Sequence, residues 1–408
     1  MLVEVEGSQA VAEAIVGAAP EVVCAYPITP QTHIVEGVGR AVRSGALHAE
    51  FINVESEFAA LSVLIGASAA GARTYTATAS QGLLFMMEAV YNAGGLGLPI
   101  VMTLANRAVG APINIWNDQS DAMAARDAGW IQLFAESNQD AVDLHIQAFR
   151  IAELCSLPVM VCMDGFVLTH AVERIDVPPV DDIAAFLPRI PPRQLLTAKD
   201  PITIGAMVGP EAFTEVRAQA HEAMLKARTT IERVRGEFRG TFGRDAGGLV
   251  TPYRLDDAET VIVGMGSVLG TMKDVVDRRR ARGEHIGVLG VTTFRPFPSE
   301  AIREALSGRK HIIVLERAFA TGTGGILTND IARALFNDDG ELFTVVLGLG
   351  GRPILEDALD SIFVRLRYGT LPDFSFLDLH AEHSGGSSPR QELPVHRFGS
   401  PLSRRSTR

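Results

Sequence analysis

The stretch Val22-Val23-Cys24-Ala25-Tyr26 is an apolar, β-rich run that ends at Pro27, and it sets the rhythm of the first half of the chain. Runs of the same kind follow it, and helix-like segments separate them. Near-continuous apolar strands that alternate with helices are typical of a parallel sheet covered on both faces. The expected strands are 22–26, 52–54, 74–78, 100–104 and 158–162, and the expected helices are 31–42, 56–71, 81–94 and 138–155.

A second α/β unit is expected from residue 259 onward. The Pro-rich segment 171–211 lacks periodicity, which predicts a linker or arm, and the Glu- and Arg-rich segment 211–239 predicts a helix that is exposed or packs one face on a partner. The polar, basic residues 384–408 predict a disordered tail. The second unit's expected strands are 259–263, 285–291, 311–315 and 343–348, and its expected helices are 268–281, 298–307, 325–336 and 353–367.

The composition excludes several classes of protein. With 408 residues, 47% of them apolar, the chain can bury a large core, and its formal net charge of -11 argues against nucleic acid or anionic membrane as the main partner. The three cysteines Cys24, Cys155 and Cys162 form no C-x-x-C, so this chain alone is not expected to hold an iron–sulfur cluster. No signal peptide is apparent, and the longest apolar run, Phe58 to Gly71, is too short to span a bilayer. We therefore expect a soluble, cytoplasmic protein.

Three motifs receive a structural interpretation. Gly264 to Gly270 reads G-x-G-x-x-x-G, which misses the dinucleotide fingerprint by one position and indicates a tight strand–helix turn. Asp118 and Asp121 could bind a divalent ion, but a helix N-cap with an exposed carboxylate is favoured. His380 and His383 border the tail, where a solvated edge is favoured. No metal site is predicted.

The ends of the expected strands are more informative, because ligands of parallel sheets bind beyond the carboxyl ends of the strands. Two prolines stiffen the first strand end around Thr29. Glu57 follows the second strand, at the mouth of an apolar helix where a carboxyl could exchange a proton with a ligand. Ser80 and Gln81 open a polar turn after the third strand, and Arg107, suited to a carboxylate, follows the fourth. The alternatives are an ordinary helix-start carboxylate for Glu57 and a structural ion pair for Arg107.

Four separated motifs, in the expected order, give the chain a family resemblance. They are Tyr26-Pro27-Ile28-Thr29-Pro30, Glu55-Ser56-Glu57, Ser80-Gln81-Gly82-Leu83 and Thr293-Phe294-Arg295-Pro296-Phe297-Pro298. Together they resemble the alpha subunit of the pyruvate:ferredoxin oxidoreductases, members of the 2-oxoacid:ferredoxin oxidoreductase family. The resemblance runs from about residue 5 to 370.

The resemblance implies a fold and a set of partners. Residues 1–195 would form the pyrimidine-binding domain of a thiamine diphosphate fold, 196–257 a linker and charged helix, and 258–370 a transketolase C-terminal-like α/β domain. A beta subunit would hold the diphosphate and its Mg²⁺. The iron–sulfur clusters would lie on partner subunits of the beta, gamma and delta types. Ferredoxin, coenzyme A and a 2-oxoacid would be the remaining partners.

The resemblance also implies roles for the strand-end residues. Glu57 matches the family glutamate that hydrogen-bonds the aminopyrimidine N1′, and Thr29 and Arg107 match residues near the substrate carboxylate. Ser80 and Gln81 lie in the turn near the cofactor. The implied reaction is the coenzyme A-dependent oxidative decarboxylation of pyruvate to acetyl-CoA and CO₂ with electrons passed to ferredoxin, or its reverse.

Several alternatives stay open from the sequence. The 2-oxoacid could be phenylglyoxylate, a branched-chain acid or 2-oxoglutarate instead of pyruvate, although Thr29 disfavours oxalate. A transketolase-like enzyme without iron–sulfur partners would need a complete diphosphate motif, which this sequence lacks. A non-catalytic scaffold subunit would suit the charged helix but would leave Glu57 and Arg107 without a role.

Overall fold

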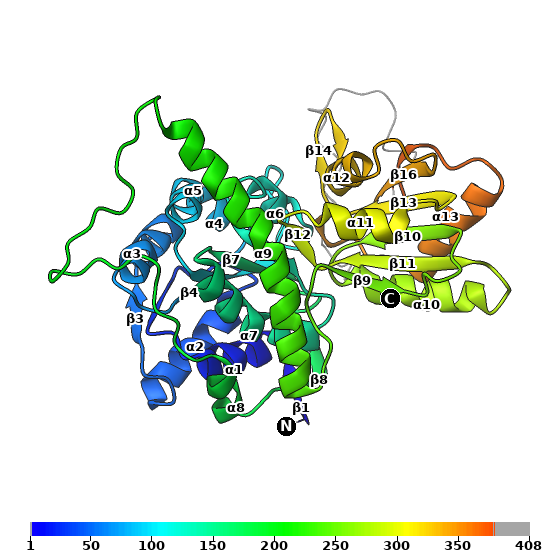
Figure 1. The fold of residues 1–408 in the computed structure, drawn as a ribbon. Coiled ribbons are helices and arrows are strands. Elements are labelled where there is room, and N and C mark those ends of the chain that lie inside the picture. The colour runs from blue at the N-terminus through cyan, green and yellow to red at the C-terminus, as the bar shows by residue number, and fades with distance from the viewer. Residues whose placement is uncertain (1, 378, 380–408) are drawn as a thin grey trace, which may run out of the picture.

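The computed structural model describes residues 2–377 and 379 and confirms an α/β fold with two main sheets (Figure 1). The first sheet has seven strands in the order β12-β6-β7-β5-β4-β2-β3, all parallel except β12. Its five expected strands are confirmed, and β6 and β12 were not predicted. The strands are β2 (Val22–Ala25), β3 (Glu50–Asn53), β4 (Thr74–Thr78), β5 (Ile100–Asn106), β6 (Ile131–Phe134), β7 (Val159–Asp164) and β12 (Thr293–Arg295).

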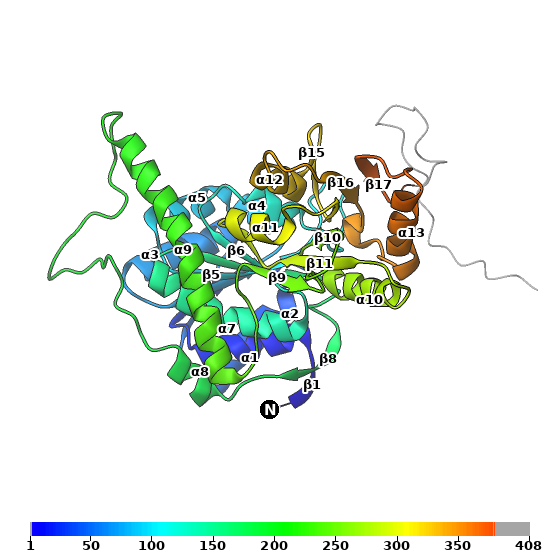
Figure 2. The same cartoon turned by 45° about the vertical axis from the view of Figure 1, so that its right-hand side comes forward.

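Helices cover both faces of the first sheet, as the alternating pattern predicts (Figure 2). The core on one face contains side chains of α1 (Gly7–Ala18), α2 (Thr32–Ser44) and α7 (Asn138–Cys155). The core on the other face contains side chains of α3 (Glu57–Ala69), α4 (Ser80–Phe85), α5 (Met87–Leu96) and α6 (Ser120–Ala124).

The segment after β7 corrects the expectation of a linker over 171–211. It begins with β8 (Val172–Asp176), which pairs antiparallel with β1 (Leu2–Glu6), and continues as α8 (Val180–Phe186). Buried Ile175 and Ile183 anchor both elements to the core, although their short, mostly exposed sequences carry little periodicity. The longest stretch of this segment without helix or strand is 187–212, which crosses the end of α3, where the Leu196 amide donates to the Ala69 carbonyl (2.9 Å).

The charged helix is α9 (Phe213–Phe242), which runs diagonally across the first unit in Figure 1. Its second half packs on α7 of the same chain through a stripe at helical spacing: Ala227, Ile231, Val234 and Phe238. Arg150 of α7 pairs with Glu237 at 2.7 Å. The face of this helix is thus partly covered within the chain, while its first turns are exposed.

The second sheet has the order β17-β16-β13-β10-β11-β9, and all four of its expected strands are confirmed. It begins earlier than expected, because β9 adds antiparallel to β11. Its strands are β9 (Val250–Tyr253), β10 (Thr260–Gly264), β11 (Ile286–Val291), β13 (His311–Glu316), β16 (Glu341–Val346) and β17 (Phe374–Phe376). The other elements are α10 (Val268–Arg280), α11 (Ser299–Leu306), β14 (Phe319–Ala320), β15 (Gly324–Gly325), α12 (Ile326–Ala334), the 3₁₀ turn Leu349–Gly351 and α13 (Glu356–Arg367).

The two units are joined by strand pairing as well as by packing, because one strand from the second half of the chain belongs to the first sheet. Strand β12 follows β11 in the sequence but leaves the second sheet and pairs antiparallel with β6 of the first. Phe294 of β12 is fully buried and meets Phe134 of β6 edge to face, with ring centroids 6.2 Å apart. The first three residues of the motif at 293–298 therefore complete the first sheet.

The Gly264–Gly270 segment is a turn between β10 and α10, as interpreted from its spacing. Gly266 has a φ of 76°, and a side chain there would meet Asp164 of the first unit. The Ser267 amide donates to Asp164 Oδ2 (2.8 Å), and Arg317 forms a buried ion pair with the same carboxylate. The glycines thus allow the second unit to approach the edge of the first sheet.

No helix in residues 2–377 is both long enough and apolar enough to cross a bilayer. The pair His380 and His383 and the expected tail over 384–408 lie outside the described residues.

Candidate functional site

The sequence-predicted site residues all lie at one edge of the first sheet. Strands β3, β2, β4 and β5 are consecutive neighbours and parallel, so their carboxyl ends meet along this edge. Each is followed by a residue singled out from the sequence. Thr29 follows β2, Glu57 follows β3, Ser80 and Gln81 follow β4, and Arg107 follows β5.

Glu57 is a buried carboxylate at the first position of α3. Ser56 caps this helix by accepting a hydrogen bond from the Ala59 amide (3.2 Å), which fixes the first turn. The side chain is 7% exposed, and no described residue hydrogen-bonds its carboxylate. A Cβ placed on Gly82 would lie 2.6 Å from Glu57 Oε1, so the carboxylate rests directly against the turn after β4. The Glu57 oxygens are not among the fully buried side-chain atoms that lack a partner, so the carboxylate reaches the surface at this edge and is open to a ligand.

Ser80 and Gln81 connect the β4 end to the segment after β5. Ser80 has a φ of 46°, and its hydroxyl contacts the Ala108 carbonyl oxygen (2.6 Å) and Gln81 Oε1. Gln81 Nε2 lies 2.7 Å from the position that a Cβ on Gly110 would occupy. Close packing against glycine backbone therefore holds this turn beside residues 108–110.

Arg107 joins the turn after β2 to the loop after β5. Its Nη1 donates to the backbone carbonyl of Thr29 (3.0 Å), and its Nε donates to that of Asn114 (3.0 Å). Its Nη2 has no hydrogen bond from the described part of the chain. Burial lowers the pKa of Arg107, and the nearby Asp121 opposes this shift. Arginine stays charged near neutral pH, so the group can bind an anion.

Asp121 holds these segments together, a role that the sequence did not reveal. The carboxylate is fully buried and accepts from the backbone amides of Ser80 (3.0 Å) and Arg107 (2.9 Å) and from the Asn106 side chain (2.8 Å). The amide of Ala122 donates to it as well (2.8 Å). Burial raises the pKa of Asp121 to about 7, and the hydrogen bonds act in the opposite direction.

The expectation of an exposed helix cap at Asp118 and Asp121 was wrong. Asp118 is also buried and accepts from the amides of Ser120 (2.9 Å) and Gly350 (3.2 Å), the latter from the second unit. The end of the loop, residues 117–121, lies against the second unit, which removes both carboxylates from solvent. Because backbone amides occupy their oxygens, the pair fits a structural role better than a metal site.

Large apolar side chains surround this edge and face solvent. They belong to the same strand-end segments or to the helices that follow them, and they are Tyr26, Phe58, Phe85, Ile113 and Trp116. Such a rim around a buried carboxylate is typical of a surface that another protein covers.

Comparisons with known proteins agree on one family. Residues 13–236 match the family described as pyruvate flavodoxin/ferredoxin oxidoreductase, thiamine diP-binding, and residues 258–358 match pyruvate:ferredoxin oxidoreductase core domain II. Pyruvate synthase subunit PorA of Methanosarcina barkeri is 46% identical over 391 residues, which cover 93% of this chain and 97% of that protein. Ketoisovalerate oxidoreductase subunit VorA of Pyrococcus abyssi is 40% identical over 351 residues, 85% of this chain and 89% of that protein.

One solved structure supports the fold. The 2-oxoglutarate:ferredoxin oxidoreductase of Magnetococcus marinus superposes with a TM-score of 0.68 at 20% identity. The match covers 90% of this chain and 65% of that chain.

The contact between Gly82 and Glu57 leads to a first prediction. In Gly82→Ala the new Cβ would meet both Glu57 Oε1 and Thr78 Oγ1, so we expect a loss of about 1–3 kcal/mol of unfolding free energy. Gly95→Ala, in α5 with open space around its Cβ, is the matched control and should be neutral or slightly stabilising. Urea unfolding followed by circular dichroism measures both, and equal midpoints for the two variants would contradict the close packing.

Proposed function

This chain belongs to the pyruvate flavodoxin/ferredoxin oxidoreductase family, and we propose that it is the pyruvate synthase subunit that binds the aminopyrimidine end of thiamine diphosphate and the 2-oxoacid. The proposed reaction converts pyruvate and coenzyme A to acetyl-CoA and CO₂, with the electrons passed to ferredoxin, or runs in reverse. The observation that carries the proposal is Glu57, a buried carboxylate without a protein partner at the ligand edge of the sheet.

The residues at this edge fit thiamine diphosphate. Glu57 is free to hydrogen-bond a ring nitrogen. Because residue 82 is a glycine, the Glu57 carboxylate can occupy the space that a side chain at position 82 would fill. When bound, the cofactor supplies a carbon nucleophile and an electron sink for decarboxylation. Glu57 would hold a proton at the aminopyrimidine N1′, and Ser80 and Gln81 would line the ring from the neighbouring turn.

Arg107 and Thr29 are proposed to orient the substrate carboxylate. The Arg107 Nη1 and Nε hydrogen bonds fix the guanidinium plane, which leaves Nη2 for an anion. The same bonds hold the Thr29 turn in place beside it. A charge-assisted hydrogen bond to a fixed guanidinium both binds and aligns a carboxylate.

Other subunits complete the proposed enzyme. Cys24 in β2, Cys162 in β7 and Cys155 at the end of α7 are free and lie on separate elements, which supports iron–sulfur clusters on partner chains. A beta subunit would supply the diphosphate and Mg²⁺ site, cover the apolar rim, and assemble with gamma- and delta-type subunits. The proposal includes the expected domain division at 195 and 258, with β9 as an N-terminal extension of the second domain's sheet, and a cytoplasmic location.

The experiment that tests the function uses the complex purified anaerobically through a tag on this chain. We expect coenzyme A-dependent viologen reduction with pyruvate as the best substrate in a panel of 2-oxoacids. Activity led by 2-oxoisovalerate would instead assign the function of the VorA relative. The absence of activity with every 2-oxoacid, despite bound clusters, would support the scaffold alternative.

Glu57→Gln tests the proton-holding role. A glutamine cannot take up and release the N1′ proton, so exchange of the cofactor C2 hydrogen for deuterium should slow by about 100-fold or more. Proton NMR of the quenched cofactor measures this rate in the complex. Glu36→Gln, on the exposed side of α2, is the control. An unchanged exchange rate in Glu57→Gln would refute the role.

Arg107→Ala tests the carboxylate site. Loss of one charged hydrogen bond should raise KM for pyruvate by about 10- to 100-fold, with thiamine diphosphate affinity nearly intact. Steady-state kinetics and cofactor titration separate the two effects. Arg303→Ala, which also removes an arginine that donates to a backbone carbonyl (Ala334, 3.0 Å), is the control in the second unit. Equal losses of pyruvate and cofactor binding would contradict the assignment.

A further inference from the structure

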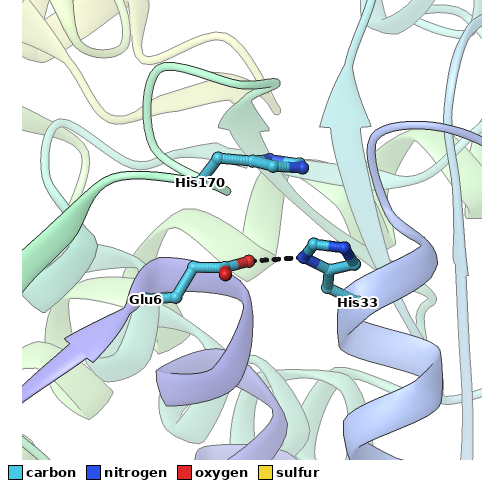
Figure 3. A group of neighbouring side chains, drawn as sticks. All are labelled: Glu6, His33 and His170. Carbon is cyan, nitrogen blue, oxygen red and sulfur yellow. Dashed lines mark hydrogen bonds and ion pairs between the residues drawn. The ribbon is translucent and has the colours of Figure 1, made fainter.

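A cluster of metal-binding side chains lies outside the proposed active site. Glu6 at the end of β1, His33 in the first turn of α2 and His170 in the segment after β7 converge on one point (Figure 3). One ligand atom of each lies within 4.8 Å of the other two. The three residues are far apart in sequence, so only the fold brings them together.

Hydrogen bonds already orient the three side chains. Glu6 Oε1 and His33 Nδ1 are 2.7 Å apart, and the His33 and His170 rings have centroids 4.8 Å apart. His170 Nδ1 is hydrogen-bonded to Thr169 Oγ1 (2.7 Å), which leaves Nε2 of that ring for a ligand. A hydrogen bond at the other ring nitrogen is the usual way in which proteins fix a metal-binding histidine.

The backbone around the cluster is held in the same arrangement. The Gly7 amide donates to the Ala171 carbonyl (3.0 Å), and the Ser8 amide and hydroxyl both donate to the Thr169 carbonyl (2.9 and 2.6 Å). These bonds join the residues next to Glu6 to those on both sides of His170. Two of the three positions are therefore fixed before any ion binds.

We propose that Glu6, His33 and His170 form a zinc site. Two imidazoles and one carboxylate are a borderline donor set that suits Zn²⁺, whereas Mg²⁺ and Ca²⁺ prefer oxygen ligands alone. Tetrahedral zinc needs ligand atoms about 3.3 Å apart, given bonds of about 2.0 Å. The His33 side chain is 50% exposed, so it can rotate to close the remaining gap, and water can take the fourth position.

The position of the site gives the ion a structural consequence. His33 begins the helix that follows the Thr29–Pro30 turn, and a Cβ on Gly165, in the segment that carries His170, would lie 2.6 Å from Pro30 Cγ. Phe166 of that segment contacts both His170 and Trp116. Zinc would therefore tie α2 to the segment after β7 and restrain the turn that presents Thr29.

The test measures the binding of Zn²⁺ and of Mg²⁺ to the full chain. The protein is prepared without a histidine tag and is freed of metal with a chelator. Isothermal titration should show a zinc site in the wild type whose affinity falls at least about tenfold in His33→Ala and in His170→Gln. His48→Ala removes an exposed histidine away from the cluster and should keep the affinity. His380, His383 and His396 are present in every variant, so any binding by them is a constant background.

Two further readouts decide the outcome. Zn²⁺, and not Mg²⁺, should raise the melting temperature of the wild type and of His48→Ala but not of His33→Ala. Because His33 is half exposed, its variant should unfold at the wild-type temperature in the presence of chelator. Zinc binding that survives in both His33→Ala and His170→Gln, no zinc binding by the wild type, or equal stabilisation by Mg²⁺ would overturn the proposal.

Discussion

The Asp121 carboxylate is the constraint on which the ligand edge depends. Four N–H groups, from the ends of β4 and β5 and from α6, converge on two buried oxygens. A buried carboxylate is costly unless it is fully hydrogen-bonded, and it is fully bonded here only when all three segments are in place. The turn beside Glu57 and the start of the Arg107 loop are consequently fixed by one side chain that itself faces no ligand.

The second unit also forms hydrogen bonds with the loop at this edge. Gly350 donates to Asp118, Gly351 donates to the Asn117 carbonyl (2.6 Å), and Gln119 donates to the Met265 and Arg317 carbonyls. The loop that carries Arg107 is thereby hydrogen-bonded to Asp121 at its start and to turns of the second unit near its end. The buried pair of Asp164 and Arg317 closes the junction at the end of β7. In this chain the second unit thus serves to position the first.

The sequence predicted the parts of the fold that are buried and local. Strands β2, β5 and β7 are near-continuous apolar runs and β4 is a run rich in β-branched residues. The meeting of their ends along one edge follows from general rules for parallel sheets. Strands β1 and β8 were missed because they form a short ribbon in which only Ile175 is buried, and β12 was missed because its partner β6 lies some 160 positions earlier.

The positions of the candidate site residues could be predicted for the same reason, whereas their roles stay a prediction. The sequence placed Thr29, Glu57, Ser80, Gln81 and Arg107 at strand ends, and the structure brings these ends together. It could not distinguish a buried carboxylate from an exposed cap at Asp121, because a five-residue helix has too little pattern to reveal its burial. The convergence of Glu6, His33 and His170 likewise depends on long-range topology, which no local pattern encodes.

Strand β12 has a consequence for how such chains can evolve. Because residues 293–295 complete a sheet whose other six strands all precede residue 165, the two units are not interchangeable modules. A split of the gene in the connection after α9 would separate β6 from its neighbour β12. The N-terminal product would then expose β6 as a new sheet edge. Recombination within this lineage is therefore expected to exchange the pair of units whole, with breakpoints outside them.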